Sequence, residues 1–185
     1  MYSDETMQVF ESIELPKFEW KETIMPVDYL EAIWKGSPNY DLRSPLIAID
    51  TIVIHSAEGT LPGMDTWFAN LNSQVSVHYG VGWNGEVHQY VKEANRAWHV
   101  GVGDWNDHSI GIELEGWAGG VFDSYHAQWT ALVELTKYLM QKYNISAEHI
   151  KGHSQLDSVK SDPGPGFAWD KFFSDLGEQT WPEWY

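Results

Sequence analysis

Two segments of the chain have the apolar pattern of β-strands. Residues 46–56 (LIAIDTIVIHS) are almost continuously apolar and rich in β-branched side chains, which is typical of a strand buried on both faces. Residues 76–91 contain two short apolar runs separated by Asn84 and Gly85, a pair that favours the tight turn of a hairpin. We therefore expect a buried strand followed by a β-hairpin.

A further strand, expected at residues 109–117 (SIGIELEGW), has two different faces. Isoleucine and leucine alternate with glycine and glutamate, and this period of two places Glu113 and Glu115 together on the face opposite the apolar side chains. The alternation alone does not distinguish the two carboxylates. One face of this strand is therefore predicted to be acidic.

Helical spacing predicts the remaining elements. Apolar residues recur every three or four positions over 124–143, with Asp123 or Ser124 as the N-cap and Asn144 near the end, so this is the longest expected helix. Shorter helices are expected at residues 27–34, 64–71 and 167–176.

The order of these elements predicts the fold class and the domain boundaries. Strands interleaved with helices in a chain of 185 residues indicate a single α/β domain with helices flanking a central sheet. The hairpin makes this sheet mixed rather than purely parallel. We assign residues 1–40 to an acidic, aromatic N-terminal arm, 41–176 to the folded domain and 177–185 to a C-terminal tail.

The composition excludes several classes of protein. A formal net charge of −16 argues against binding to nucleic acid and against unaided attraction to anionic membranes or cell-wall polymers. The absence of cysteine excludes disulfides and thiolate metal ligands. No apolar run reaches the length of about 18 residues that a transmembrane helix needs, so no membrane insertion is expected. The acidic N-terminus lacks the features of a signal peptide, so we expect synthesis in the cytoplasm.

Three polar residues occupy positions that favour a metal site. His55 directly follows the predicted buried strand, at the kind of edge where α/β proteins build their sites. His153 follows a glycine, and Asp162 precedes a Pro-Gly-Pro stretch that rigidifies its loop. Their segment, 152–167, is too rich in Gly, Pro and Ser to predict a regular helix or strand. Because a catalytic zinc takes three protein ligands and keeps an open position, these residues are a candidate zinc set.

Four segments carry a resemblance to a known family: SPNYDLRSP with IDTIVIHSAEGT, VSVHYGVGWNGEVHQYVKEANRAWHVG, NDHSIGIELEG and GHSQLDSVKSDPGPGF. In the same order, they resemble the zinc-dependent N-acetylmuramoyl-L-alanine amidases, which include AmpD-type enzymes, phage amidase endolysins and animal peptidoglycan recognition proteins. The resemblance covers residues 37–175 and implies a mixed β-sheet flanked by helices, with zinc in a groove at the sheet edge. It also implies that residues 41–176 form the amidase catalytic domain.

The resemblance implies a role for each candidate residue. His55, His153 and Asp162 match the ligands of Zn²⁺, and the aspartate is similar to that of the AmpD-type branch. The implied reaction is hydrolysis of the amide between the lactyl group of N-acetylmuramic acid and L-alanine of the stem peptide. Glu113 matches the general acid and base, and Lys160 matches a lysine that stabilises the oxyanion. Residues that match positions in the substrate groove are Trp98, His99 and Asn106.

Three functions remain open from the sequence. An amidase is favoured because all three candidate ligands and Glu113 are present. A recognition module would bind muropeptide without cutting it, and a zinc peptidase would use the same residues on a different amide. In the first two cases the partner is peptidoglycan or a muropeptide. The settings that suit such a chain are a phage endolysin released through a holin, a cytoplasmic recycling enzyme, and the catalytic domain of a larger protein.

Overall fold

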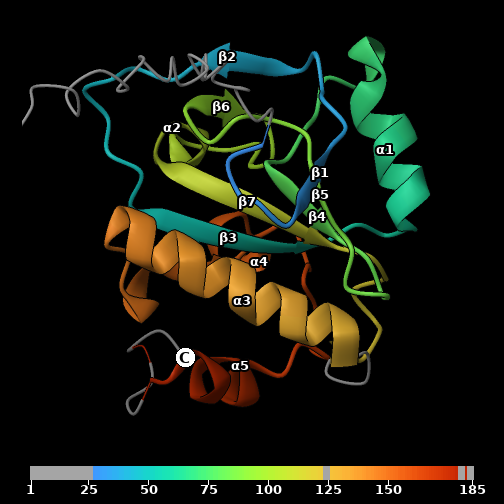
Figure 1. The fold of residues 1–185 in the computed structure, drawn as a ribbon, viewed down its shortest axis with the longest axis vertical. Helices are drawn as coiled ribbons and strands as arrows, with labels where there is room; N and C mark the ends of the chain where they lie inside the picture. Colours follow the sequence, from blue (N-terminus) through green and yellow to red (C-terminus); the bar gives the residue numbers. More distant parts are fainter. Residues whose placement is uncertain (1–26, 123–125, 179–181, 183–185) are drawn as a thin grey trace, which may run out of the picture.

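The computed structural model describes residues 27–122, 126–178 and 182. The strands of its main sheet are β1 (Ala32–Trp34), β3 (Thr51–Ser56), β4 (Tyr79–Val81), β5 (Val87–Gln89), β7 (Ser109–Leu114) and β8 (Ile150–Gly152). Their order across the sheet is β1-β5-β4-β7-β3-β8 (Figure 1). The hairpin strands β4 and β5 pair antiparallel, and the other neighbours pair parallel, so the predicted mixed sheet is confirmed.

Helices cover both faces of this sheet. The described helices are α1 (Leu61–Ala69), α2 (Trp105–His108), α3 (His126–Tyr143), α4 (His153–Leu156) and α5 (Trp169–Leu176), and 3-10 turns span Leu71–Ser73 and Ala147–His149. In Figure 1, α3 and α5 lie on one side of the sheet, whereas α1 and α2 lie on the other with a small antiparallel pair, β2 (Tyr40–Leu42) and β6 (Asn95–Ala97). Within the described ranges, no helix combines the length and apolar character needed to cross a membrane.

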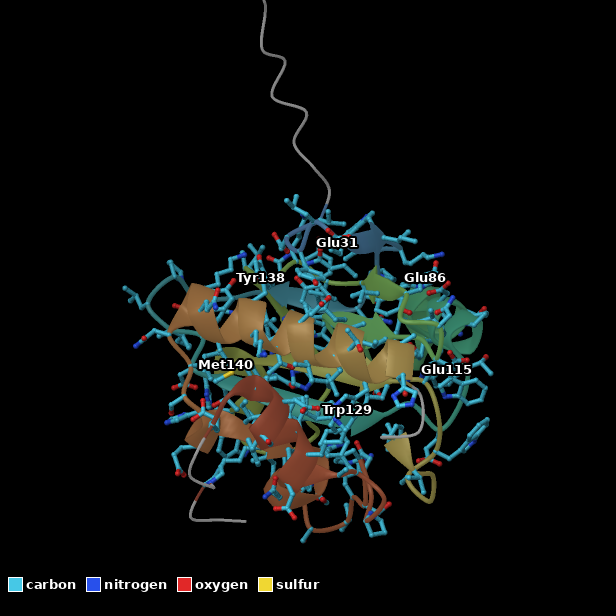
Figure 2. The ribbon with its side chains drawn as sticks, turned by 60° about the horizontal axis from the view of Figure 1, so that its bottom comes forward. Glu31, Glu86, Glu115, Trp129, Tyr138 and Met140 are labelled. Atoms are coloured by element: carbon cyan, nitrogen blue, oxygen red, sulfur yellow. The ribbon has the colours of Figure 1, made fainter. Side chains whose placement is uncertain are left out.

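Strands β3 and β7 lie at the centre of the sheet and are packed tightly against the core. All six residues of β3 are buried, and the isoleucines of β3 and β7 pack in one core with α3 and α5. Burying one such side chain stabilises a fold by about 1.5–3 kcal/mol. On the outer side, Trp129 lies between α3 and α5, where its indole N–H donates to Asp175 at 2.7 Å (Figure 2). This packing fixes the position of β3 and β7, and so of the side chains on their other face, which points toward α1.

Several predicted elements are confirmed by the structure. The hairpin, the long helix and the C-terminal helix occur as β4–β5, α3 and α5. The buried strand predicted at residues 46–56 occurs as the shorter β3, and Leu46 is 94% exposed. Helix α1 begins earlier than predicted because the side chain of Thr60 caps it, accepting a hydrogen bond from the N–H of Gly63 at 3.2 Å. The predicted N-cap of α3, Asp123 or Ser124, lies outside the described residues.

The helix predicted at residues 27–34 is wrong. The end of this segment is the strand β1, in which Ala32 pairs with Val87 of β5. The turn before it is fixed by the N–H of Asp28, which donates to the side chain of Gln89 at 2.7 Å. Pairing with the sheet edge therefore outweighs the local helical pattern, as tertiary context often does.

The segment 152–167 also differs from its prediction, because it begins with a helical turn. The four-residue helix α4 starts at His153. The side chain of Gln155 accepts a hydrogen bond from the N–H of Gly152 at 2.6 Å, which satisfies a backbone group at the start of this turn. The rest of the segment is irregular, as predicted.

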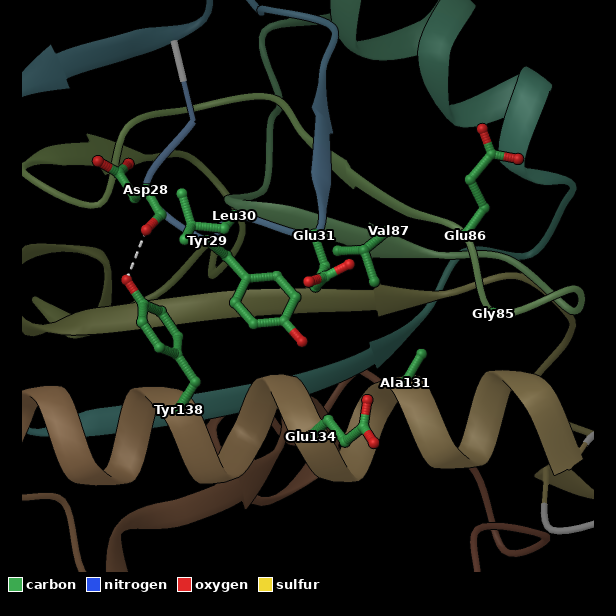
Figure 3. A pocket seen from close by; sticks show the side chains of 10 residues that line it. All are labelled: Asp28, Tyr29, Leu30, Glu31, Gly85, Glu86, Val87, Ala131, Glu134 and Tyr138. Carbon is green, nitrogen blue, oxygen red and sulfur yellow. Dashed lines mark hydrogen bonds between the residues drawn. The ribbon is translucent and has the colours of Figure 1, made fainter. Parts of the chain in front are cut away.

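A cavity of about 570 Å³ lies between α3, the turn before β1 and the start of β5, and three glutamates contribute to its lining (Figure 3). The rings of Tyr29 and Tyr138 are 5.1 Å apart there, and the Tyr138 hydroxyl donates to the carbonyl of Asp28 at 2.7 Å. These contacts attach the start of the described chain to α3. The cavity shares no lining residue with the site described below.

Candidate functional site

A second cavity, of about 540 Å³, lies over the ends of β3 and β7, and α1 forms part of its wall. Seven of the eight residues that the sequence predicts for the site line this cavity: His55, Trp98, His99, Glu113, His153, Lys160 and Asp162. The eighth, Asn106, does not line it. The fold therefore brings together candidates that lie up to about one hundred positions apart in the chain.

Three of these side chains present their donor atoms to one common point. His55 Nδ1 is 3.1 Å from His153 Nδ1 and 3.0 Å from Asp162 Oδ2, and His153 Nδ1 is 3.1 Å from Asp162 Oδ2. Ligands at about 2.0–2.1 Å from a tetrahedral zinc are about 3.3 Å apart, so this nearly equilateral triangle has the size of one face of such a site. The donor set therefore fits zinc, with a fourth position open toward the cavity.

Strand pairing explains why these residues meet. β3 and β8 pair in parallel with Ile54 opposite Gly152. The next residue in each segment, His55 on β3 and His153 at the start of α4, therefore lies at the same end of the two strands. The loop then returns, and the N–H of Ser154 donates to the carbonyl of Asp162 at 2.9 Å. The Gly-rich and Pro-rich segment thus folds back on itself to add the third donor.

Glu113 faces this triangle from the neighbouring strand. It is the cross-strand partner of His55 in the parallel β3–β7 pair, and adjacent strands lie about 4.8 Å apart. Its Oε2 atom is buried and has no hydrogen-bond partner among the described residues. Burial, together with the nearby carboxylate of Asp162, raises the pKa of Glu113 to about 8.

Glu115, which the sequence pattern did not distinguish from Glu113, lies elsewhere. It follows the end of β7, and its carboxylate accepts a hydrogen bond from the N–H of Trp83 in the hairpin turn at 2.9 Å. It does not line the cavity. The two carboxylates therefore have different surroundings, and Glu113 is the one placed for chemistry.

The raised pKa of Glu113 predicts a pH-dependent effect of Glu113→Gln on the metal-free protein. The folded-state pKa lies above the ordinary value of 4.5, so the bound proton stabilises the fold fully below that pH, and this contribution is lost as pH rises through about 8. Glutamine cannot ionise. The free energy of unfolding of the variant minus that of wild type, measured with denaturant, should be about 2–4 kcal/mol larger near pH 8.5 than near pH 5.5. An equal gain at both pH values would contradict the assigned environment.

Behind His55, further histidines lie on the same face of the sheet. His55 Nε2 is 3.0 Å from His99 Nδ1, and His99 Nε2 is 3.2 Å from the hydroxyl of Ser109. Burial lowers the pKa of His55 and of His99. Burial, with the charge of Arg43, lowers the pKa of His78 to about 3. All three rings are therefore neutral near pH 7.

The other predicted groove residues have different exposures. Trp98 lines the cavity, and its indole N–H donates to Asp41 at 2.8 Å. Asn106 is 8% exposed, and its amide binds the backbone of residues 99 and 100 at 2.8–3.2 Å. Its geometry is that of a residue that supports the cavity wall, and direct contact with substrate stays a prediction. Lys160 is exposed at the cavity rim.

Sequence reasoning missed a residue of the cavity wall. Trp67 projects from α1, lines the cavity and is 53% exposed. Its place in an amphipathic helix carries no signal that its ring faces a ligand, because half-exposed tryptophans are common on helices. The packing of α1 against β4, which the sequence does not specify, places it there.

Comparison with known proteins agrees with this geometry. Residues 45–165 match the family model for N-acetylmuramoyl-L-alanine amidase. The chain is 34% identical over 166 residues to the 1,6-anhydro-N-acetylmuramyl-L-alanine amidase AmpD of Haemophilus influenzae, covering 76% of this chain and 89% of that protein.

Solved structures extend the similarity to the fold. A crystal structure of AmpD matches with a TM-score of 0.71 and 32% identity, over 82% of this chain and 99% of that one. The amidase AmiD of Escherichia coli, solved in complex with the substrate anhydro-N-acetylmuramic acid-L-Ala-D-γ-Glu-L-Lys, matches with a TM-score of 0.62 and 32% identity, over 76% of this chain and 63% of that one. The motifs, the fold and these matches agree, and the chain belongs to the N-acetylmuramoyl-L-alanine amidase family.

Proposed function

We propose that this protein is a zinc amidase that hydrolyses the amide between N-acetylmuramic acid and L-alanine of a muropeptide, with zinc held by His55, His153 and Asp162. The observation that supports this most strongly is the triangle of donor atoms with edges of 3.0–3.1 Å at the base of the cavity. A bound zinc ion would supply Lewis acidity, which activates water at neutral pH and polarises the scissile carbonyl.

Glu113 is the general base and acid in this proposal. Its unpartnered Oε2 takes a proton from the attacking water and then delivers it to the nitrogen of the departing L-alanine. A group that both accepts and releases a proton works best when its pKa is near the operating pH, and burial raises the pKa of Glu113 toward that range in the metal-free protein. Cross-strand pairing with His55 keeps this carboxylate beside the metal ligands.

Lys160 has the role of stabilising negative charge that develops on the carbonyl oxygen. It lies in the loop between His153 and Asp162 and reaches the same cavity. Among the described residues that line this cavity it is the one lysine or arginine, beside the carboxylates of Glu58, Glu113 and Asp162. Its ammonium group is therefore the cation available there for an oxyanion.

We expect Lys160→Ala to lower kcat and kcat/KM together by about 10²- to 10³-fold, because an interaction made only in the transition state affects both equally. Zinc should stay bound. Steady-state kinetics on a soluble muropeptide measure this, and Lys137→Ala, on α3 at the other side of the sheet, is the matched control. A rise in KM at unchanged kcat would instead make Lys160 a substrate-binding residue.

The muropeptide chosen for such assays follows from the relatives. AmpD is named for 1,6-anhydro-N-acetylmuramyl-L-alanine, and the AmiD complex contains an anhydro-muropeptide with a three-residue peptide. We propose that the present chain accepts the same class of soluble substrate. A parallel assay on intact sacculi distinguishes recycling of fragments from lysis of the wall.

Metal removal tests the proposed function. A chelator should abolish release of peptide from the anhydro-muropeptide, and one equivalent of zinc per chain should restore it. Elemental analysis of the purified protein should find one zinc. Full turnover in the metal-free protein would refute the proposal, and so would His55→Ala with unchanged turnover.

A further inference from the structure

Ser109 and His99 form a chain of hydrogen bonds that ends on His55. The Ser109 hydroxyl is 2.6 Å from the carbonyl of Trp105, His99 Nε2 is 3.2 Å from Ser109 Oγ, and His99 Nδ1 is 3.0 Å from His55 Nε2. Ser109 is completely buried, and His55 is 1% exposed. Neither Ser109 nor His99 supplies a donor atom to the ligand triangle.

The positions of the protons follow from the first link of this chain. A carbonyl oxygen only accepts, so the one hydroxyl proton of Ser109 is committed to Trp105 at 2.6 Å. Ser109 Oγ must then accept from His99, which places the proton of the neutral His99 ring on Nε2. His99 Nδ1 is left as an acceptor, so His55 must donate to it from Nε2. The remaining nitrogen of His55, Nδ1, is then left to bind zinc, which replaces the proton that the Asp162 carboxylate at 3.0 Å would otherwise accept from it.

The reverse arrangement would break the shorter of the two contacts that the Ser109 hydroxyl makes. If Ser109 donated to His99, the chain would run the other way, and His55 would carry its proton on Nδ1, where a metal must bind. The carbonyl of Trp105 would then lose its bond from Ser109, which at 2.6 Å is shorter than the contact to His99 at 3.2 Å. The shorter contact therefore favours the direction that frees His55 Nδ1.

The backbone of β7 is shaped to receive the His99 ring. A Cβ atom on Gly111 would lie 2.7 Å from both Cγ and Nδ1 of His99, so a side chain at this position would displace the ring. The N–H of Gly111 is occupied by His78 Nδ1 at 3.0 Å. The absence of a side chain at Gly111 thus leaves room for the His99 ring to pack against β7, within hydrogen-bond distance of His55.

We propose that Ser109 and His99 are positioning residues that hold His55 in the tautomer with its proton on Nε2, so that Nδ1 is free to bind the metal. The inference rests on the zinc site of the proposed function. In this proposal His99 acts by orienting His55, whereas the family resemblance implies that His99 contacts the substrate directly.

Two substitutions at His99 separate this role from packing. Asparagine places its side-chain oxygen where Nδ1 of His99 lies and can still accept from His55, whereas leucine has a similar size and no acceptor. Partners that orient a metal ligand typically contribute about 10- to 100-fold to metal affinity. We expect His99→Leu to weaken zinc binding by about that factor, and His99→Asn to retain most of the affinity.

Zinc affinity is measured by competition with a chromophoric chelator, independently of activity. Ser109→Ala should weaken binding less than His99→Leu, because it removes only the group that fixes the His99 tautomer. His149→Leu, at an exposed position in the turn before β8, is the matched control and should bind zinc as wild type does. Equal affinities for wild type, His99→Leu and Ser109→Ala would overturn the proposal.

Nitrogen-15 NMR of the imidazole rings in the zinc-loaded wild type gives a second readout, which needs no variant to fold. Zinc is included because the Asp162 carboxylate, 3.0 Å from His55 Nδ1, favours a proton on that nitrogen when the metal is absent. With zinc bound, the proton of His99 should be found on Nε2, and a proton on Nδ1 would overturn the proposal. Failure of this inference is distinguishable from failure of the proposed function. A wild type that binds no zinc contradicts the function, whereas a wild type that binds zinc with the His99 proton on Nδ1 contradicts only the inference.

Discussion

Glu113→Gln should lower kcat by about 10²- to 10⁴-fold while leaving one zinc bound, because the amide cannot take a proton from water. The side chain keeps its size, and its strand is paired on both sides, with His55 on β3 and Gly80 on β4. The fold should therefore be retained. Single-turnover kinetics on a soluble muropeptide, with zinc measured on the same sample, test this expectation.

The matched control is Glu115→Gln, the same substitution two positions along the chain. Glu115 binds the N–H of Trp83 and lies outside the cavity, so kcat should change only a few-fold. If Glu115→Gln were the damaging change and Glu113→Gln were mild, the assignment of the catalytic carboxylate would be wrong.

Asp162→Ala should cause the largest loss of metal. It removes one of three donor atoms, so zinc affinity should fall by more than the roughly 10- to 100-fold that groups outside the ligand set contribute. Turnover should fall in proportion to zinc occupancy and recover partly when zinc is added in excess. Chelator competition and elemental analysis after dialysis measure both effects.

Ser161→Ala is the control for this loop. Ser161 is exposed and directly precedes Asp162, so the substitution changes the same backbone segment without removing a donor. Its zinc affinity should equal that of wild type. If Asp162→Ala bound zinc as tightly as Ser161→Ala, the ligand would have to be a different residue.

Periodicity was sufficient to predict the elements that carry the site. The continuous apolar run of β3 and the alternation of β7 identified both strands. The alternation did not show that the second face of β7 is also buried, where the His99 ring packs against Gly111. The helix predicted at 27–34 failed because Ala32 pairs with Val87, a contact between residues 55 positions apart. Local patterns carry no information about such a partner.

The ligand set could be predicted because His55 follows a strand end, Asp162 precedes a rigid Pro-Gly-Pro stretch, and the motifs around both residues resemble those of the amidase family. The alternation could not choose between Glu113 and Glu115, because both have the same parity and the strand ends between them, and only the resemblance favoured Glu113. The role of Ser109 could not be predicted from the sequence either, because a serine at the start of a strand is common. It becomes visible only when the carbonyl of Trp105 and the ring of His99 are both found within 3.2 Å of its hydroxyl.

The most direct test is to identify the bond that the purified protein cuts. Incubation of the zinc-loaded protein with anhydro-N-acetylmuramic acid linked to L-Ala-D-γ-Glu-L-Lys should yield the free sugar acid and a peptide with a new L-alanine amino terminus, both detectable by mass spectrometry. The Glu113→Gln protein should bind the substrate and release almost none. Tight binding by the wild type without cleavage, or a new amine on any residue other than L-alanine, would contradict the account.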